Sequence, residues 1–95
     1  MNPPSAALFG FAYSQRALDF LGTIPAKLRK QIVKKIMALA DNPLPQGHKL
    51  IRGMSGDEER VYRIRSGDYR VLYVVRNNPG HIVVLDIDHR KDVYR

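Results

Sequence analysis

Three arginines lie close together in one short stretch of the chain, residues 61–75. Arg63 and Arg65 are two residues apart, and Arg70 follows a Ser66-Gly67-Asp68 turn. The stretch is rich in Tyr, Val and Ile, which predicts the two strands of a β-hairpin, and strand periodicity puts Arg63 and Arg65 on one face. Because burying unpaired charge is costly, we expect these side chains to line a partly open surface that binds an anion.

A cluster of guanidinium groups suits a phosphodiester, because each group can hold two phosphate oxygens at once. Phosphoryl chemistry needs little beyond positioning and stabilisation of charge on the equatorial oxygens. The other residues that could join this chemistry are Lys49, His89, Arg90 and Tyr94. The three histidines are too scattered to predict a metal site, and P-loop, dinucleotide, zinc and EF-hand spacings are absent. We therefore expect neither a cofactor nor a metal.

The charge balance indicates the same class of partner. Sixteen Lys and Arg against nine Asp and Glu give a formal charge of +7, which points to nucleic acid or an acidic protein, although a solubilising surface is the alternative. Without cysteine, disulfides, thiolate metal sites and thiol nucleophiles are excluded. No run of eighteen apolar residues and no signal peptide is present, so we expect a cytoplasmic protein that does not enter a membrane.

The elements that must position the arginines begin with one strand and two helices. We expect a strand at residues 8–13, a helix capped by Ser14 and ending at Gly22, and a second helix with Pro25 as its first residue. Apolar residues repeat along the second helix at three- and four-residue intervals until Asp41-Asn42-Pro43 ends it. Ninety-five residues form a single domain, 1–95, and residues 1–7 read as a loose end.

Three or four strands follow the helices, with an acidic loop from Met54 to Glu59 and a turn at residues 77–80 between them. This order predicts an α+β fold: a small antiparallel sheet of about four strands with the two helices, both from the N-terminal half, packed on one face. We expect the first strand to lie beside the later ones. The face without helices would be a concave, partly solvated surface.

Together these residues resemble the successive landmarks of the RelE/ParE toxin superfamily. The resemblance covers residues 8–95. It rests on Arg63-Ile64-Arg65, on the Gly67–Tyr73 segment, on the His89–Tyr94 segment, on the helical pair opened by Pro25 and closed by Asn42-Pro43, and on Lys49–Gly53.

The resemblance implies a toxin of a type II toxin–antitoxin system whose partner is a cognate acidic antitoxin, largely disordered until it binds. The RelE branch implies a metal-independent endoribonuclease that cleaves messenger RNA in the ribosomal A site, beside ribosomal RNA. There the ribose 2′-hydroxyl attacks the adjacent phosphate and leaves a 2′,3′-cyclic phosphate and a 5′-hydroxyl. The ParE branch has the same fold but inhibits DNA gyrase. A small RNA-binding module without catalysis is a third interpretation.

Position by position, the resemblance implies that Arg70 stabilises charge on the scissile phosphate. Arg90 would donate to the same phosphate near the leaving 5′-oxygen, and Tyr94 would stack on a base or help activate the 2′-hydroxyl. The residues expected to bind RNA elsewhere are Lys49, Arg52, Lys27, Lys30 and Lys34. Three alternatives stay open: an ion pair of Arg70 with Asp68 or Asp86, a core-capping Tyr94, and a merely solvated face for the helix lysines.

Arg63 and Arg65 stand where the RelE branch often has a lysine pair. Lysine can lose its proton beside other cations and act as a base, whereas arginine effectively cannot. Arg63 and Arg65 therefore supply charge but are poor proton acceptors. The general base would have to be Tyr94, a Lys49 with a lowered pKa, or His89, whose ordinary pKa is about 6.5.

Overall fold

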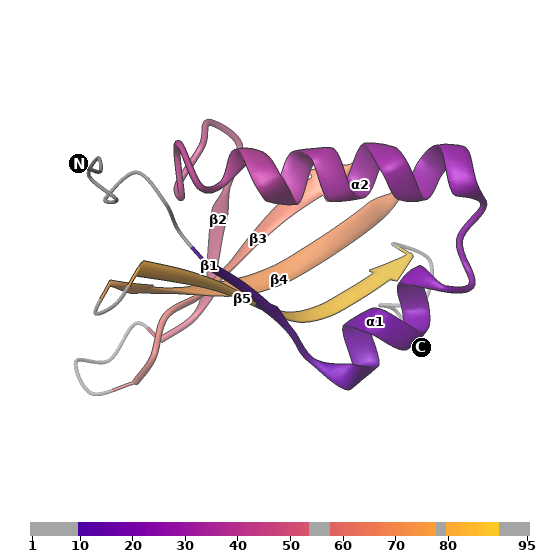
Figure 1. Cartoon of the computed structure of the whole chain (residues 1–95). Helices are drawn as coiled ribbons and strands as arrows, with labels where there is room; N and C mark the ends of the chain where they lie inside the picture. Colours follow the sequence, from indigo (N-terminus) through magenta and orange to yellow (C-terminus); the bar gives the residue numbers. More distant parts are fainter. Residues whose placement is uncertain (1–9, 54–57, 78–79, 90–95) are drawn as a thin grey trace, which may run out of the picture.

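The computed structural model describes residues 10–53, 58–77 and 80–89, which form one sheet and two helices (Figure 1). Along the chain the elements are β1 (Gly10–Tyr13), α1 (Gln15–Leu21), α2 (Ala26–Ala38), β2 (Lys49–Arg52), β3 (Val61–Ser66), β4 (Tyr69–Asn77) and β5 (Gly80–His89). The predicted α+β class is confirmed. The expected loose end at residues 1–7 and most of the acidic loop lie outside the described residues. Neither described helix is long and apolar enough to cross a membrane.

The sheet differs from the prediction in strand number and in one direction. Its five strands have the order β1-β5-β4-β3-β2, and β1 runs parallel to β5 while the other neighbours are antiparallel. The two helices carry the chain from one edge of the sheet to the other, so β1 and β2 never pair (Figure 1). Three reversals from β2 to β5 then bring β5 back to the direction of β1. The expectation that the first strand lies beside the later ones is confirmed.

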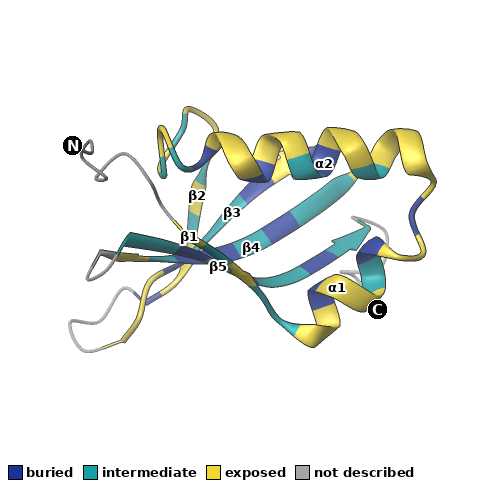
Figure 2. Ribbon diagram, viewed as in Figure 1, coloured by how far each residue is buried: buried dark blue, intermediate teal, exposed yellow. Residues whose placement is uncertain are grey.

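One core joins both helices to one face of the sheet. On β3 and β4 the buried residues of this face include Ile64, Val71 and Tyr73, and α2 contributes Ile32 and Ile36. Figure 2 shows the outer side of α2 exposed while its buried positions turn toward the sheet. Burying each such side chain stabilises the fold by roughly 1.5–3 kcal/mol, so this alternation decides which face the helices cover.

The predicted cap of α1 is confirmed and also ties the helix to the sheet. The Ser14 hydroxyl accepts from the backbone N–H of Ala17 at 3.0 Å and donates to the Leu85 carbonyl at 2.7 Å. The backbone N–H of Ser14 also donates to the Val84 carbonyl at 2.9 Å, which continues the parallel pairing past β1. One residue thus starts α1 and fixes it beside β5.

The bounds of α2 differ from the prediction by one residue at its start and by three at its end. Pro25 is the N-cap and not the first helical residue. At the other end the backbone N–H groups of Leu39 and Asp41 donate to carbonyls three residues earlier, Ile36 and Ala38, at 3.0 and 3.1 Å. Such bonds tighten the chain into a narrower turn ahead of a proline, so the α-helix itself stops at Ala38.

Tyr73 anchors the segment that follows α2. Its ring is completely buried in β4, and its hydroxyl donates to the Pro43 carbonyl at 2.7 Å. Burial, with a smaller contribution from Tyr62, raises the pKa of Tyr73 to about 12. The neutral hydroxyl is thus the form that the folded protein holds.

We expect Tyr73→Phe to lower the free energy of unfolding by about 1 kcal/mol at pH 8, the value of one hydrogen bond. The unfolded chain releases this proton near pH 10, and the folded chain keeps it to about pH 12. The stabilisation is therefore complete below pH 10 and is lost as the pH rises toward 12, by about 1.4 kcal/mol per unit. Urea unfolding at pH 8 and pH 11 should find a deficit at pH 8 that disappears at pH 11; an equal deficit at both contradicts the prediction.

Two glycines with nearly the same positive φ, Gly47 and Gly53, offer a matched test of packing. Gly53, buried just after β2, has φ +92°, and a Cβ there would lie 2.5 Å from the Glu59 carbonyl oxygen. Gly47 has φ +94°, but a Cβ there would meet nothing within 4 Å. We expect Gly47→Ala to cost about 1–2 kcal/mol of stability for the left-handed conformation alone, and Gly53→Ala roughly 1–3 kcal/mol more. Equal costs in urea unfolding would show that the close approach at Gly53 is relieved without strain.

Candidate functional site

The three hairpin arginines lie on the face of the sheet opposite the helices. Arg63 pairs with Leu72 and Arg65 with Arg70 in the antiparallel register of β3 and β4, while the alternate residues enter the core. Arg65 is exposed, and Arg63 and Arg70 are half-buried with their Nε atoms shielded from solvent. We call these three residues the arginine face.

The strands on either side contribute one cation and one carboxylate to this face. Lys49 of β2 lies opposite Arg63, and Asp88 of β5 lies opposite Arg70. Asp86 lies opposite Leu72 instead and forms an ion pair with Arg16, Oδ1 to Nε 3.4 Å. Sequence reasoning named Asp68 and Asp86 as acidic partners of Arg70 and missed Asp88. The alternation of Asp86 and Asp88 in the last strand, combined with the hairpin register, was the available signal.

A fourth arginine on the same side of β4 is neutralised. The Arg76 guanidinium makes two hydrogen bonds to the Glu59 carboxylate, Nε to Oε2 2.9 Å and Nη2 to Oε1 3.1 Å. The hydrogen bond from Arg76 lowers the pKa of Glu59, and the same bond raises the pKa of Arg76. The end of β4 that carries Arg76 therefore adds no net charge through this pair.

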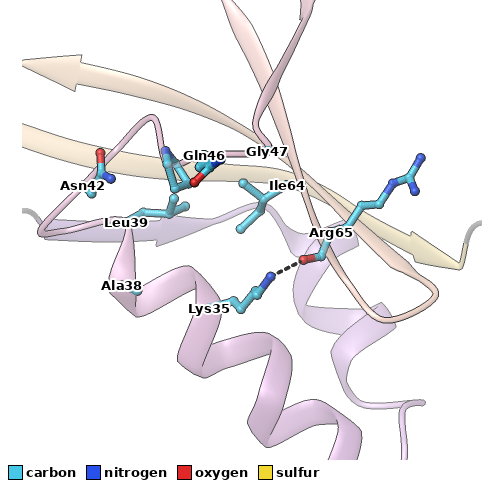
Figure 3. Close-up of a pocket in the computed structure, with 9 residues that line it drawn as sticks. Lys35, Ala38, Leu39, Asn42, Gln46, Gly47, Ile64 and Arg65 are labelled. Carbon is cyan, nitrogen blue, oxygen red and sulfur yellow. Dashed lines mark hydrogen bonds between the residues drawn. The ribbon is translucent and has the colours of Figure 1, made fainter.

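Helix α2 supports the arginine face from behind. The Lys35 ammonium donates to the Arg65 backbone carbonyl at 2.9 Å across a cavity of about 460 Å³ lined mainly by α2, the segment before β2 and β3. In Figure 3 the Ile64 side chain reaches into this cavity, whereas the Arg65 side chain points away from it. Lys35 thus holds the backbone of a strand whose charged side chains face the other way. No pattern in the sequence predicted this bond.

The remaining predicted residues are not gathered at the arginine face. Lys27, Lys30 and Lys34 are exposed on α2, which covers the opposite side of the sheet. The His89 ring also stands on the helix side, with its centroid 5.2 Å from that of Tyr69. Exposed Arg52 pairs with Val61 at the end of β2. The structure does not describe Arg90 or Tyr94. Among the residues it does describe, no group of three His, Asp or Glu is placed to hold a metal ion.

Comparison with known proteins agrees with this architecture. The family model of the ParE toxin of type II toxin–antitoxin systems, parDE, matches residues 11–94. The chain is 32% identical over 87 residues to a candidate toxin RelE1 of Methanocaldococcus jannaschii, covering 92% of this chain and 96% of that protein. It is 32% identical over 76 residues to toxin RelG of Mycobacterium tuberculosis, covering 79% and 83%.

A solved structure extends the similarity to three dimensions. A chain of the archaeal RelE–RelB complex from Pyrococcus horikoshii OT3 superposes with a TM-score of 0.74 at 25% identity, over 86% of this chain and 94% of that one. Fold, family model and relatives agree along nearly the whole described chain. The protein therefore belongs to the RelE/ParE superfamily of type II toxin–antitoxin toxins.

Proposed function

We propose that this toxin is an endoribonuclease that cleaves messenger RNA in the ribosomal A site. The observation that carries the proposal is the arginine face: Arg65 and Arg70 are directly opposed across the hairpin, with Arg63 beside them on β3. Like charges directly opposite each other on a sheet are destabilising, and the three arginines with Lys49 outnumber the one carboxylate, Asp88, that lies opposite Arg70, so the face favours a further anion. A phosphodiester of RNA can be this anion. The resemblance to RelE implies that the phosphodiester is cleaved.

In this mechanism the ribose 2′-oxygen attacks the adjacent phosphorus and the 5′-oxygen leaves, which yields a 2′,3′-cyclic phosphate and a 5′-hydroxyl. Arg70 stabilises the charge that builds on the phosphate oxygens. Arg63 and Arg65 hold the RNA strand through its phosphates. Arg90 and Tyr94 take the roles that the resemblance implies, as a donor near the leaving oxygen and as a group beside a base or the 2′-hydroxyl.

The proton of the 2′-hydroxyl needs an acceptor that an arginine cannot be. Lys49 is a stronger candidate than His89, because Lys49 lies opposite Arg63 in the register and the His89 ring is on the helix side of the sheet. The neutral form of a lysine can accept a proton, whereas arginine effectively has no neutral form. Tyr94 is the third candidate.

We also propose a cognate antitoxin as the cellular partner. The archaeal RelE to which this chain is similar was solved together with RelB. A formal charge of +7 suits an acidic partner, which would cover the arginine face and keep RNA away from it. Co-purification of the two proteins from their native operon tests this, and a lone chain that is stable and non-toxic in cells contradicts it.

The second candidate function is inhibition of DNA gyrase, favoured by the match of the ParE family model to residues 11–94. It requires no phosphate-binding cluster. Induction of the toxin with parallel labelling of new protein and new DNA distinguishes the two. Early loss of protein synthesis supports RNA cleavage, and early loss of DNA synthesis supports gyrase inhibition.

We predict that Arg70→Ala lowers the rate of messenger cleavage on programmed ribosomes by about 100- to 1000-fold, the usual effect of removing one preorganised charge donor. Arg76→Ala is the matched control, since Arg76 lies on the same strand and side as Arg70 but far from the β3–β4 turn, where its guanidinium binds Glu59. Sequencing of the fragment ends measures both rates. Intact messenger with the wild-type toxin, or equal cleavage by Arg70→Ala and wild type, would refute the proposed function.

A further inference from the structure

A small cavity lies at the end of the β3–β4 hairpin, on the helix side of the sheet. Its volume is about 240 Å³, and it is lined by α2, by the hairpin turn and by the last residue of β5: Leu28, Gln31, Ser66, Gly67, Asp68, Tyr69 and His89. At roughly 30 Å³ per water molecule, this is room for about eight water-sized groups. We call it the hairpin-end cavity.

Two aromatic rings form one wall of the hairpin-end cavity. The rings of Tyr69 and His89 meet edge to face, with centroids 5.2 Å apart and planes at 90°. Phe20 of α1 also packs edge to face with Tyr69, with centroids 6.2 Å apart. Both Tyr69 and His89 are only half-buried. The wall is thus held in place by three elements while part of its aromatic surface remains accessible.

The polar groups of the cavity suit a neutral, flat ligand better than an anion. Gln31 offers a carboxamide that both donates and accepts, Ser66 a hydroxyl at the buried end, and Asp68 a carboxylate at the exposed turn. None of the described lining residues is Lys or Arg, so the Asp68 carboxylate would repel a phosphate. Stacking on an aromatic wall with hydrogen bonds at the edge is how proteins bind single-stranded RNA bases.

The cavity and the arginine face are opposite sides of the same two strands. Across the hairpin, Ser66 lies opposite Tyr69 on the cavity side, and Arg65 lies opposite Arg70 on the arginine face. In sequence, Ser66 directly follows Arg65 and Tyr69 directly precedes Arg70. Successive residues of a strand are about 3.3 Å apart and point to opposite faces. An RNA strand that leaves its phosphate at Arg65 and Arg70 therefore needs only to pass the exposed turn to bring a neighbouring base to the cavity.

We propose that the hairpin-end cavity binds one nucleobase next to the cleaved phosphate and thereby sets the base preference of the toxin. The role of the cavity in base preference rests on the proposed function. The binding of a nucleobase to the cavity does not. Gln31 is the residue that reads the base edge. The base stacks on the accessible face of one of the two rings, Tyr69 or His89, because their planes are perpendicular and a flat base can lie parallel to only one of them.

Binding is tested on the isolated protein with the uncharged nucleosides cytidine, uridine, adenosine and guanosine. They carry no phosphate and so report the cavity apart from the arginine face. We expect millimolar nucleoside to shift the aromatic NMR signals of Tyr69 and His89 in a saturable way, and Gln31→Leu to weaken binding about tenfold. Gln46→Leu is the matched control, because Gln46 is also exposed but lines the cavity beneath Lys35.

The second measurement is cleavage of messenger RNA on programmed ribosomes, with each of the four bases placed in turn at each A-site position. Gln31→Leu should reduce the ratio of the fastest to the slowest base at one position about tenfold, whereas Gln46→Leu should leave that ratio as in the wild type. The inference is overturned if the toxin cleaves messenger but nucleosides shift no NMR signal of Tyr69 or His89. It is also overturned if Gln31→Leu and Gln46→Leu have the same base preference in cleavage. A wild-type toxin that binds nucleosides but leaves messenger intact overturns the proposed function instead.

Discussion

The structure depends on the strict alternation of side chains along β3 and β4 in a fixed register. On one side, Ile64 and Val71 oppose each other in the core, and one residue further along Arg65 and Arg70 oppose each other outside it. A shift of one residue in either strand would bury guanidinium groups and expose the core. The hydrophobic energy that holds the helices on one face therefore also forces the charge onto the other.

Two hydrogen bonds between the α2 region and the sheet reinforce this separation of the hydrophobic core from the charged face. The Lys35 bond to the Arg65 carbonyl and the Tyr73 bond to the Pro43 carbonyl each join the α2 region to a strand. Neither bond uses a side chain of the arginine face. The cationic side chains thus stand on a backbone held from behind, which favours a site whose geometry is formed before the ligand arrives.

Local stability and function oppose each other at the turn end of the hairpin. Arg65 and Arg70 are directly opposed across the hairpin, and like charges in this position destabilise a sheet. Asp88 of β5 lies opposite Arg70, but the three arginines and Lys49 together outnumber this one carboxylate. The opposed Arg65 and Arg70 are consistent with a surface that binds a further anion, either messenger RNA or an acidic partner protein. This is the chemical basis for proposing RNA cleavage, as in RelE, within a superfamily that also contains the ParE toxins.

The sequence by itself determined the features that depend on local spacing. Strand period placed Arg63 and Arg65 together, Ser14 marked the start of α1, and the element order indicated the α+β class. Only the tertiary structure decided what depends on pairing between distant segments. The parallel β1–β5 contact, Asp88 as the neighbour of Arg70, and the position of His89 on the helix side follow from sheet order and from the register shift between β4 and β5. A one-residue shift exchanges the two faces, and no local pattern reports it, because the residues that define it lie on different strands.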